Sequence, residues 1–89
     1  MVTRRPAEEI ARLGEGIYER DIRREVEDAH DGDFVAIDVE SGSWAVAGSE
    51  LDAAKRLQER LPDAVNVWLL RVGYRAIASI GGGSLRSIR

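Results

Sequence analysis

The alternating stretch DFVAIDVESGSWAVAG at residues 33–48 constrains the fold more than any other part of this sequence. Successive side chains of a strand point to opposite faces. From residue 34 to residue 39, one face would carry Val35, Ile37 and Val39, and the other would carry Phe34, Ala36 and Asp38. Residues 40–43, Glu-Ser-Gly-Ser, have the composition of a turn, and Trp44–Ala47 returns as a second strand. The stretch predicts an antiparallel β-hairpin.

A long amphipathic helix is predicted before the hairpin, as an N-terminal arm over about residues 6–29. Pro6 suits its first turn, and apolar residues recur four apart along two stripes that differ in phase. Gly14 and Gly16 lie where the stripes change, and each weakens a helix by about 1 kcal/mol relative to Ala. Two alternatives stay open: two shorter helices, or one helix with two buried faces. Because a small sheet would leave part of this arm uncovered, we expect an association surface and a homo-oligomer, formed through Ile10, Leu13, Ile17, Tyr18, Ile22 and Val26.

The residues after the hairpin predict a helix and a third strand. Ser49 is the expected N-cap of a helix that runs to about Leu61 and ends before Pro62. Its predicted buried stripe is Leu51, Ala54, Leu57 and Leu61. Residues 65–72 are almost continuously apolar, as in a strand covered on both faces, and the preceding helix would allow parallel pairing with a hairpin strand. Residues 74–80 fit either a short helix or a strand.

These elements predict the α+β class, with the arm followed by a hairpin–helix–strand unit that forms a small sheet. The 89 residues fit a single domain over residues 1–80, followed by a flexible Gly-rich tail at 81–89. The chain contains no cysteine, which excludes disulfides and cysteine-based zinc sites. Its start lacks a secretory signal, and no apolar run is long enough to span a bilayer. A cytoplasmic protein without membrane contact is expected.

The string Ile-Asp-Val-Glu at residues 37–40 resembles the first motif of proofreading 3′–5′ exonucleases. Two-metal chemistry needs several carboxylates that converge on ions about 4 Å apart, but only four acids follow Glu40 and no histidine follows residue 30. Asp38 and Glu40 would project from one face of a strand. We therefore expect them on the solvated side of an ordinary hairpin, with a metal-dependent hydrolase as the weaker alternative.

Other catalytic or cofactor sites are also not expected. The lone histidine, His30, lies with Asp31 and Asp33 in a segment that looks like a helix exit. The Gly-rich run at 81–84 lacks the lysine of a phosphate-binding loop. No serine lies in a nucleophile elbow. The sequence predicts a protein that is not an enzyme and that has no metal or cofactor.

Charge is distributed unevenly along the chain. All 16 acids lie in residues 1–63, whereas residues 64–89 carry four arginines and no acid. A basic segment with an aromatic residue can bind nucleic acid through phosphate contacts and base stacking. The candidate residues are Arg71, Tyr74, Arg75, Arg86 and Arg89. The pI of about 5.1 argues against strong binding, so this function is an alternative.

Residues 5–80, and above all the strings FVAID and RVGYRA, resemble a small, largely uncharacterised bacterial and cyanobacterial family. That resemblance implies a two-gene module beside a small retropepsin-like protein. The element order is also similar to that of HicB-type antitoxins, although no DNA-binding module follows the last strand. The resemblance implies a non-enzymatic protein-interaction module, an antitoxin-like or regulatory half, whose partner is itself or the product of a neighbouring gene.

Overall fold

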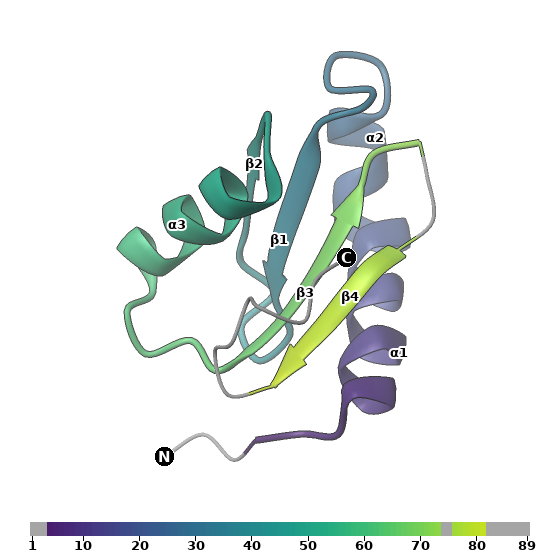
Figure 1. Cartoon of the computed structure of the whole chain (residues 1–89). Coiled ribbons are helices and arrows are strands. Elements are labelled where there is room, and N and C mark those ends of the chain that lie inside the picture. Colours follow the sequence, from purple (N-terminus) through teal and green to yellow (C-terminus); the bar gives the residue numbers. More distant parts are fainter. Residues whose placement is uncertain (1–3, 74–75, 82–89) are drawn as a thin grey trace.

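The computed structural model describes residues 4–73 and 76–81. A helical arm is followed by a hairpin, a helix and two further strands (Figure 1). The elements are α1 (Ala7–Ile17), the π-helical turn η1 (Tyr18–Ile22), α2 (Arg23–Val26), β1 (Phe34–Asp38), β2 (Trp44–Ala47), α3 (Glu50–Arg60), β3 (Asn66–Arg71) and β4 (Ala76–Gly81). The predicted α+β class is confirmed, and β4 places a strand in the segment that the sequence left ambiguous. Within the described ranges, no helix is long and apolar enough to cross a membrane.

The strands form one antiparallel sheet in the order β2-β1-β3-β4. The parallel pairing that the preceding helix would allow does not occur: β3 pairs antiparallel with β1, with Ala36 opposite Leu69. β1 pairs along both of its edges, with β2 and β3, and its two faces are covered by the two apolar cores. The helix after the hairpin still carries the chain across the sheet, but β1 lies between β2 and β3.

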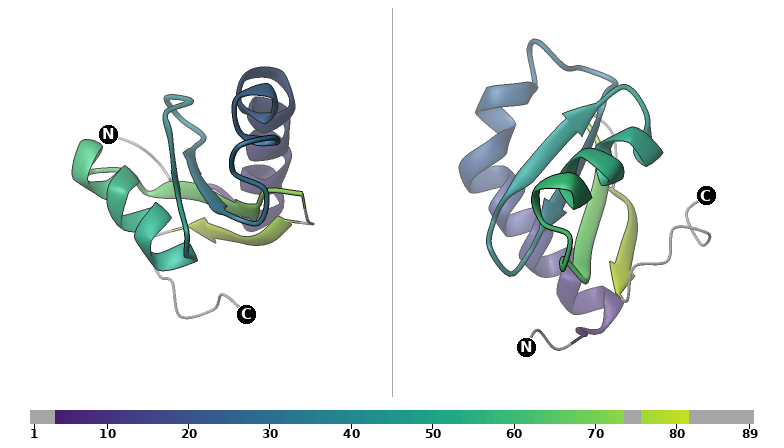
Figure 2. Two further views of the ribbon diagram at one scale, coloured as in Figure 1. Left: turned by 90° about the horizontal axis from the view of Figure 1, so that it is seen from above. Right: turned by 90° about the vertical axis from the view of Figure 1, so that its left-hand side faces the viewer.

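The sheet separates two apolar cores, and the alternation predicted for the hairpin is confirmed. Val35, Ile37 and Val39 lie in the core under the arm, whereas Ala36 lies in the core under α3. α3 contacts β1 and β2, and α1 contacts β3 and β4. Figure 2 shows the two helical layers on different sides of the sheet. Because the arm lies over β3 and β4, it leaves the corresponding face of β2 only partly covered.

The two stripes of the arm meet on one face because the helix contains a π-helical turn. Ile10 and Ile17 precede this turn, and Ile22 and Val26 follow it, yet all four are buried in the same core. A π turn inserts one extra residue into an α-helix and so changes the phase of the residues that follow. The arm is therefore one continuous helix with one buried face, which neither of the sequence alternatives foresaw.

α3 begins where the sequence predicts, but a different stripe is buried. The Ser49 hydroxyl accepts a hydrogen bond from the Asp52 N–H at 3.1 Å, as an N-cap does. Ala53 and Leu57 are buried, whereas Leu51 is 57% exposed and Ala54 is half-buried. The predicted place of Leu51 in the stripe is wrong, because Ala53 and Leu57 are the pair that faces the small alanines of the hairpin.

Candidate functional site

β2 is an edge strand, and half of its backbone groups point away from β1. The Asp38 N–H donates to the Ser43 carbonyl at 2.8 Å. Because hydrogen-bonded pairs recur at every second residue of an antiparallel ladder, the N–H and C=O groups of Trp44 and Val46 point outward. An edge strand with outward backbone groups is a template on which another strand can pair.

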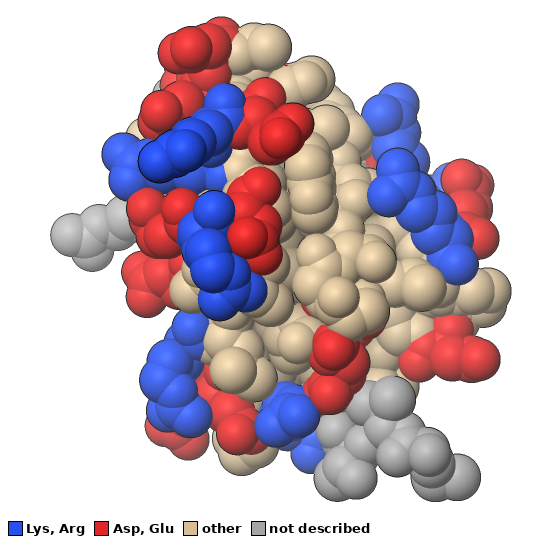
Figure 3. Space-filling model, turned by 180° about the vertical axis from the view of Figure 1, so that it is seen from behind, with Lys and Arg blue, Asp and Glu red and all other residues tan. Residues whose placement is uncertain are grey.

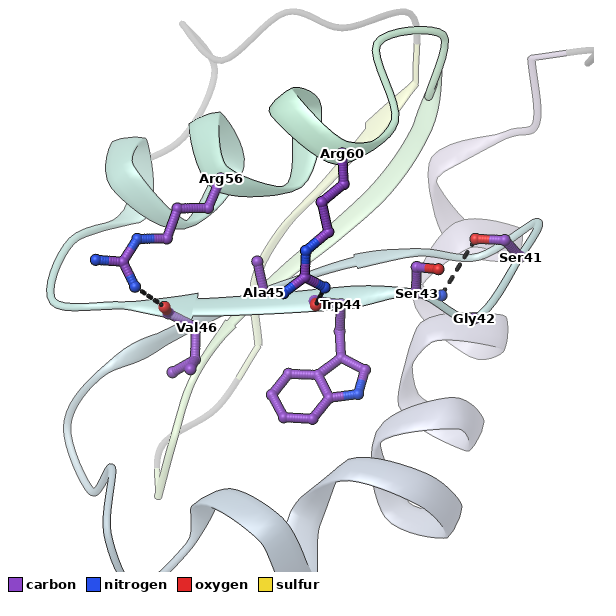
Figure 4. A pocket seen from close by; sticks show the side chains of 8 residues that line it. All are labelled: Ser41, Gly42, Ser43, Trp44, Ala45, Val46, Arg56 and Arg60. Atoms are coloured by element: carbon purple, nitrogen blue, oxygen red, sulfur yellow. Dashed lines mark hydrogen bonds between the residues drawn. The ribbon is translucent and has the colours of Figure 1, made fainter.

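Two arginines of α3 cover the outward carbonyls (Figure 4). The Arg56 Nη1 group donates to the Val46 carbonyl at 2.9 Å, and the Arg60 Nη1 group donates to the Trp44 carbonyl at 3.0 Å. Residues four apart on a helix are separated by a rise of about 6 Å. Outward groups two residues apart on a strand are separated by about 6.6 Å. The two guanidinium groups therefore match the repeat of the strand edge.

In the part of the chain that the structure describes, Arg56 and Arg60 lack the carboxylate partners that several other arginines have. Arg5, Arg20 and Arg23 form ion pairs with neighbouring acids. Within residues 4–73 and 76–81, neither Arg56 nor Arg60 has a carboxylate partner, and both side chains are exposed. The edge of β2 therefore carries two positive charges that the described part of the chain does not neutralise.

These groups border a hollow of about 570 Å³, which we call the edge groove. Its lining residues are Ser41, Gly42, Ser43, Trp44, Ala45, Val46, Arg56 and Arg60. Trp44 and Val46 are half-buried and lie at the margin of the core under the arm, and Figure 4 shows their side chains on the side of β2 away from α3. From behind, an uncharged surface separates the charged arm from charged side chains on the opposite margin (Figure 3). The groove thus has a cationic side and an apolar side.

The expectation that Asp38 is solvated is wrong. Asp38 is only 5% exposed, and its Oδ2 atom accepts hydrogen bonds from the Ser41 N–H at 3.1 Å and the Ser41 hydroxyl at 2.6 Å. A buried carboxylate needs such donors because it has lost its water. Asp38 therefore shapes the hairpin turn.

Glu40 is held by residues distant in sequence. Its carboxylate accepts hydrogen bonds from the Arg5 guanidinium and, at 3.0 Å, from the Asn66 Nδ2 group. The Asn66 side-chain oxygen in turn accepts the Arg5 N–H at 2.9 Å. The Arg5 guanidinium holds the pKa of Glu40 below its ordinary value. This network ties the segment before α1 to the hairpin and to β3.

No carboxylate cluster suited to a metal ion occurs in the part of the chain that the structure describes. Asp38 and Glu40 belong to the two separate networks above. His30 follows the arm, where its Nδ1 atom lies 3.0 Å from Asp33 Oδ2. That contact joins residues three apart in a turn, in keeping with the predicted helix exit. The geometry offers no support for a two-metal site.

The six residues expected to form an association surface lie inside the fold. Five of them are buried in the core under the arm, and Leu13 is partly buried against it. The physical reason is the π-helical turn, which aligns both stripes toward the sheet. In the folded chain the five buried side chains are therefore not free for an external contact.

Of the residues proposed for nucleic-acid binding, the structure describes Arg71 alone. Its guanidinium lies 5.4 Å from the centroid of the Phe34 ring, and its Nε group donates to the Gly32 carbonyl at 3.0 Å. Tyr74, Arg75, Arg86 and Arg89 lie outside the described residues. The structure therefore places Arg71 at the end of β3, with its side chain against Gly32 and Phe34.

Sequence reasoning missed Arg56, Arg60 and Trp44 as site residues. A signal was present, since two arginines four apart on a helix lie on one exposed face. Their meaning depends on β2 being an edge, which pairing with a distant strand decides. Comparisons with protein-family models, with curated proteins and with solved structures found no match to this chain.

Proposed function

We propose that this chain is a non-enzymatic module that binds another protein through the edge groove. The observation that carries this proposal is the outer edge of β2, which pairs with no strand among the described residues and has outward backbone groups at Trp44 and Val46. Half-buried apolar side chains at the same positions add surface that a partner can cover. Strand edges of this kind are used for recognition by β-strand addition.

The resemblance noted from the sequence suggests the first partner to test. On that resemblance, the chain is the regulatory or antitoxin-like half of a two-gene system, and its partner is the product of the neighbouring gene. The edge groove is independent of this assignment, because it requires only a partner with an extended segment.

Co-expression of the tagged chain with the neighbouring gene product tests the proposal. Val46→Pro removes an N–H group that points outward and so leaves the β1–β2 ladder intact. We expect it to abolish co-purification, whereas Val46→Thr keeps the N–H group and retains co-purification. Unfolding curves of both variants check that they fold. Full binding by a folded Val46→Pro variant would contradict the proposal, and so would the absence of any complex with the wild type.

A further inference from the structure

We infer that the edge groove takes an extended acidic segment, which adds as a strand beside β2 and carries acids at alternate positions. This inference rests on the proposed function and names the chemistry of the partner. The first step is the alternation of β2 itself. Trp44 and Val46 face the arm side of the sheet, whereas Ala45 and Ala47 face the core under α3.

An added strand would repeat this alternation. Its side chains on the α3 side would lie below Arg56 and Arg60, and those on the other side would extend the apolar surface of Trp44 and Val46. The arginines bond to carbonyls two residues apart, and alternate side chains of a strand share one face. Acids at positions i and i+2, with apolar residues at i+1 and i+3, therefore fit both sides of the groove.

The arginines must leave the carbonyls before a strand can pair with them. In a guanidinium hydrogen bond to a neutral carbonyl only the donor is charged, whereas a bond to a carboxylate joins two opposite charges, can be bidentate and is stronger. An acidic segment therefore offers each arginine a better acceptor and frees the Trp44 and Val46 carbonyls for strand pairing. A neutral or basic segment offers no such acceptor.

A second copy of the chain fits this edge less well. Two copies joined at β2 would bring four guanidinium groups, Arg56 and Arg60 from each copy, to one seam. Like charges across an interface select against that pairing. Charge complementarity thus favours an acidic partner segment over self-association.

Synthetic heptapeptides test the inference. One alternates Glu and Val, the second alternates Lys and Val, and the third has the composition of the first in a scrambled order. Amide chemical shifts of the ¹⁵N-labelled chain report binding. We expect the Glu–Val peptide to shift the Trp44 and Val46 amides. The other two peptides are expected to bind at least about fivefold more weakly.

Matched variants locate the effect. Arg56→Gln with Arg60→Gln is expected to weaken the Glu–Val peptide about fivefold. Arg12→Gln with Arg24→Gln makes the same charge change on the arm and is expected to leave binding unchanged. Equal binding of the Lys–Val peptide, or equal loss in the two double variants, would overturn the inference.

Two further outcomes separate this inference from the proposed function. If no peptide binds while the neighbouring gene product still binds in a way that Val46→Pro abolishes, the acidic-strand inference fails and the proposed function stands. Inorganic phosphate is the probe for a simple anion site. The inference would also be overturned if phosphate and the Glu–Val peptide shift the amides of Arg56 and Arg60 equally and the peptide shifts neither the Trp44 nor the Val46 amide.

Discussion

At the scale of single residues, Gly14 determines how closely the arm approaches the sheet. A Cβ atom added at Gly14 would lie 2.6 Å from side-chain atoms of Trp68. Trp68 is 3% exposed and has little room to move. The sequence alone shows only that Gly14 weakens the helix. The contact with Trp68 on β3 is a tertiary contact, which the local pattern does not predict. In the fold, the missing side chain is what allows α1 to pack there.

A pair of glycine substitutions tests this packing. Gly14→Ala is expected to destabilise the chain by about 1–3 kcal/mol, because overpacking outweighs the gain in helix propensity. Gly16→Ala is the control, since its Cβ would have no atom within 4 Å. It is expected to stabilise by about 0.5–1 kcal/mol. Urea unfolding measures both, and a Gly14→Ala variant as stable as Gly16→Ala would contradict the packing argument.

The Arg5–Glu40 pair predicts a specific dependence of stability on pH. The Arg5 guanidinium lowers the pKa of Glu40 in the folded chain. A group of this kind stabilises the fold above its unfolded pKa of about 4.3 and loses that contribution as pH falls through the folded pKa. Glu40→Gln is therefore expected to lower the melting temperature at neutral pH and to flatten its fall between about pH 5 and pH 3.

Glu25→Gln serves as the matched control for this pair, because Glu25 is exposed and forms no ion pair among the described residues. Its acid limb of melting temperature against pH is expected to follow that of the wild type. A Glu40→Gln curve with an unchanged acid limb would show that the network contributes no pH-dependent stability.

At the scale of elements, the arm shows where local pattern is sufficient and where it is not. The i, i+4 spacing identifies Ile10, Ile17, Ile22 and Val26 as apolar-face residues, and all four are buried. It does not show that they share a face, because an ideal helix would rotate Ile22 away from Ile10. The sheet imposes the π-helical turn that brings them together, and sheet packing is a tertiary effect.

Shortening or lengthening the turn tests this account. Deletion of the exposed Arg20 removes the extra residue, so a regular α-helix would keep both stripes on the sheet. Stability is expected to equal or exceed that of the wild type. Insertion of Ala after Arg20 rotates Ile22 and Val26 off the sheet, and each buried aliphatic side chain is worth about 1.5–3 kcal/mol. Urea unfolding compares them, and equal stability of the two variants would contradict the account.

The edge groove was less accessible to sequence reasoning than the hairpin that contains it. The alternation of residues 34–39 divides the β1 side chains between the two faces correctly, since the pattern is local, but it does not show that the face of Asp38 is buried. Which hairpin strand becomes the edge depends on the pairing of β1 with β3, more than thirty residues apart at Ala36 and Leu69. The hydrogen bonds of Arg56 and Arg60 to β2 follow from that choice. The site could therefore be recognised only once the order of the strands in the sheet was known.

At the scale of the whole molecule, some arginines on the described surface form ion pairs within the chain and others do not. Arg20 and Arg23 of the arm pair with acids of the arm, while Arg56 and Arg60 at the edge of β2 bond to backbone carbonyls and pair with no acid among the described residues. Charged groups that cover the edge of a sheet also discourage pairing with other chains. Arg56 and Arg60 therefore have two roles in this proposal: they exclude a second copy and admit an acidic strand.

The last prediction concerns self-association. Arg56→Gln with Arg60→Gln removes both the cover of the β2 carbonyls and the repulsion between two edges. This variant is expected to form dimers at concentrations where the wild type sediments as one chain. Arg12→Gln with Arg24→Gln changes net charge equally and is expected to stay monomeric. Sedimentation velocity over a range of concentrations measures the three chains. If the Arg56→Gln, Arg60→Gln variant stays monomeric, or if the wild type is already dimeric, the two arginines do not prevent dimerisation through β2. In the dimeric wild type, Val46→Pro then tests whether β2 forms the contact.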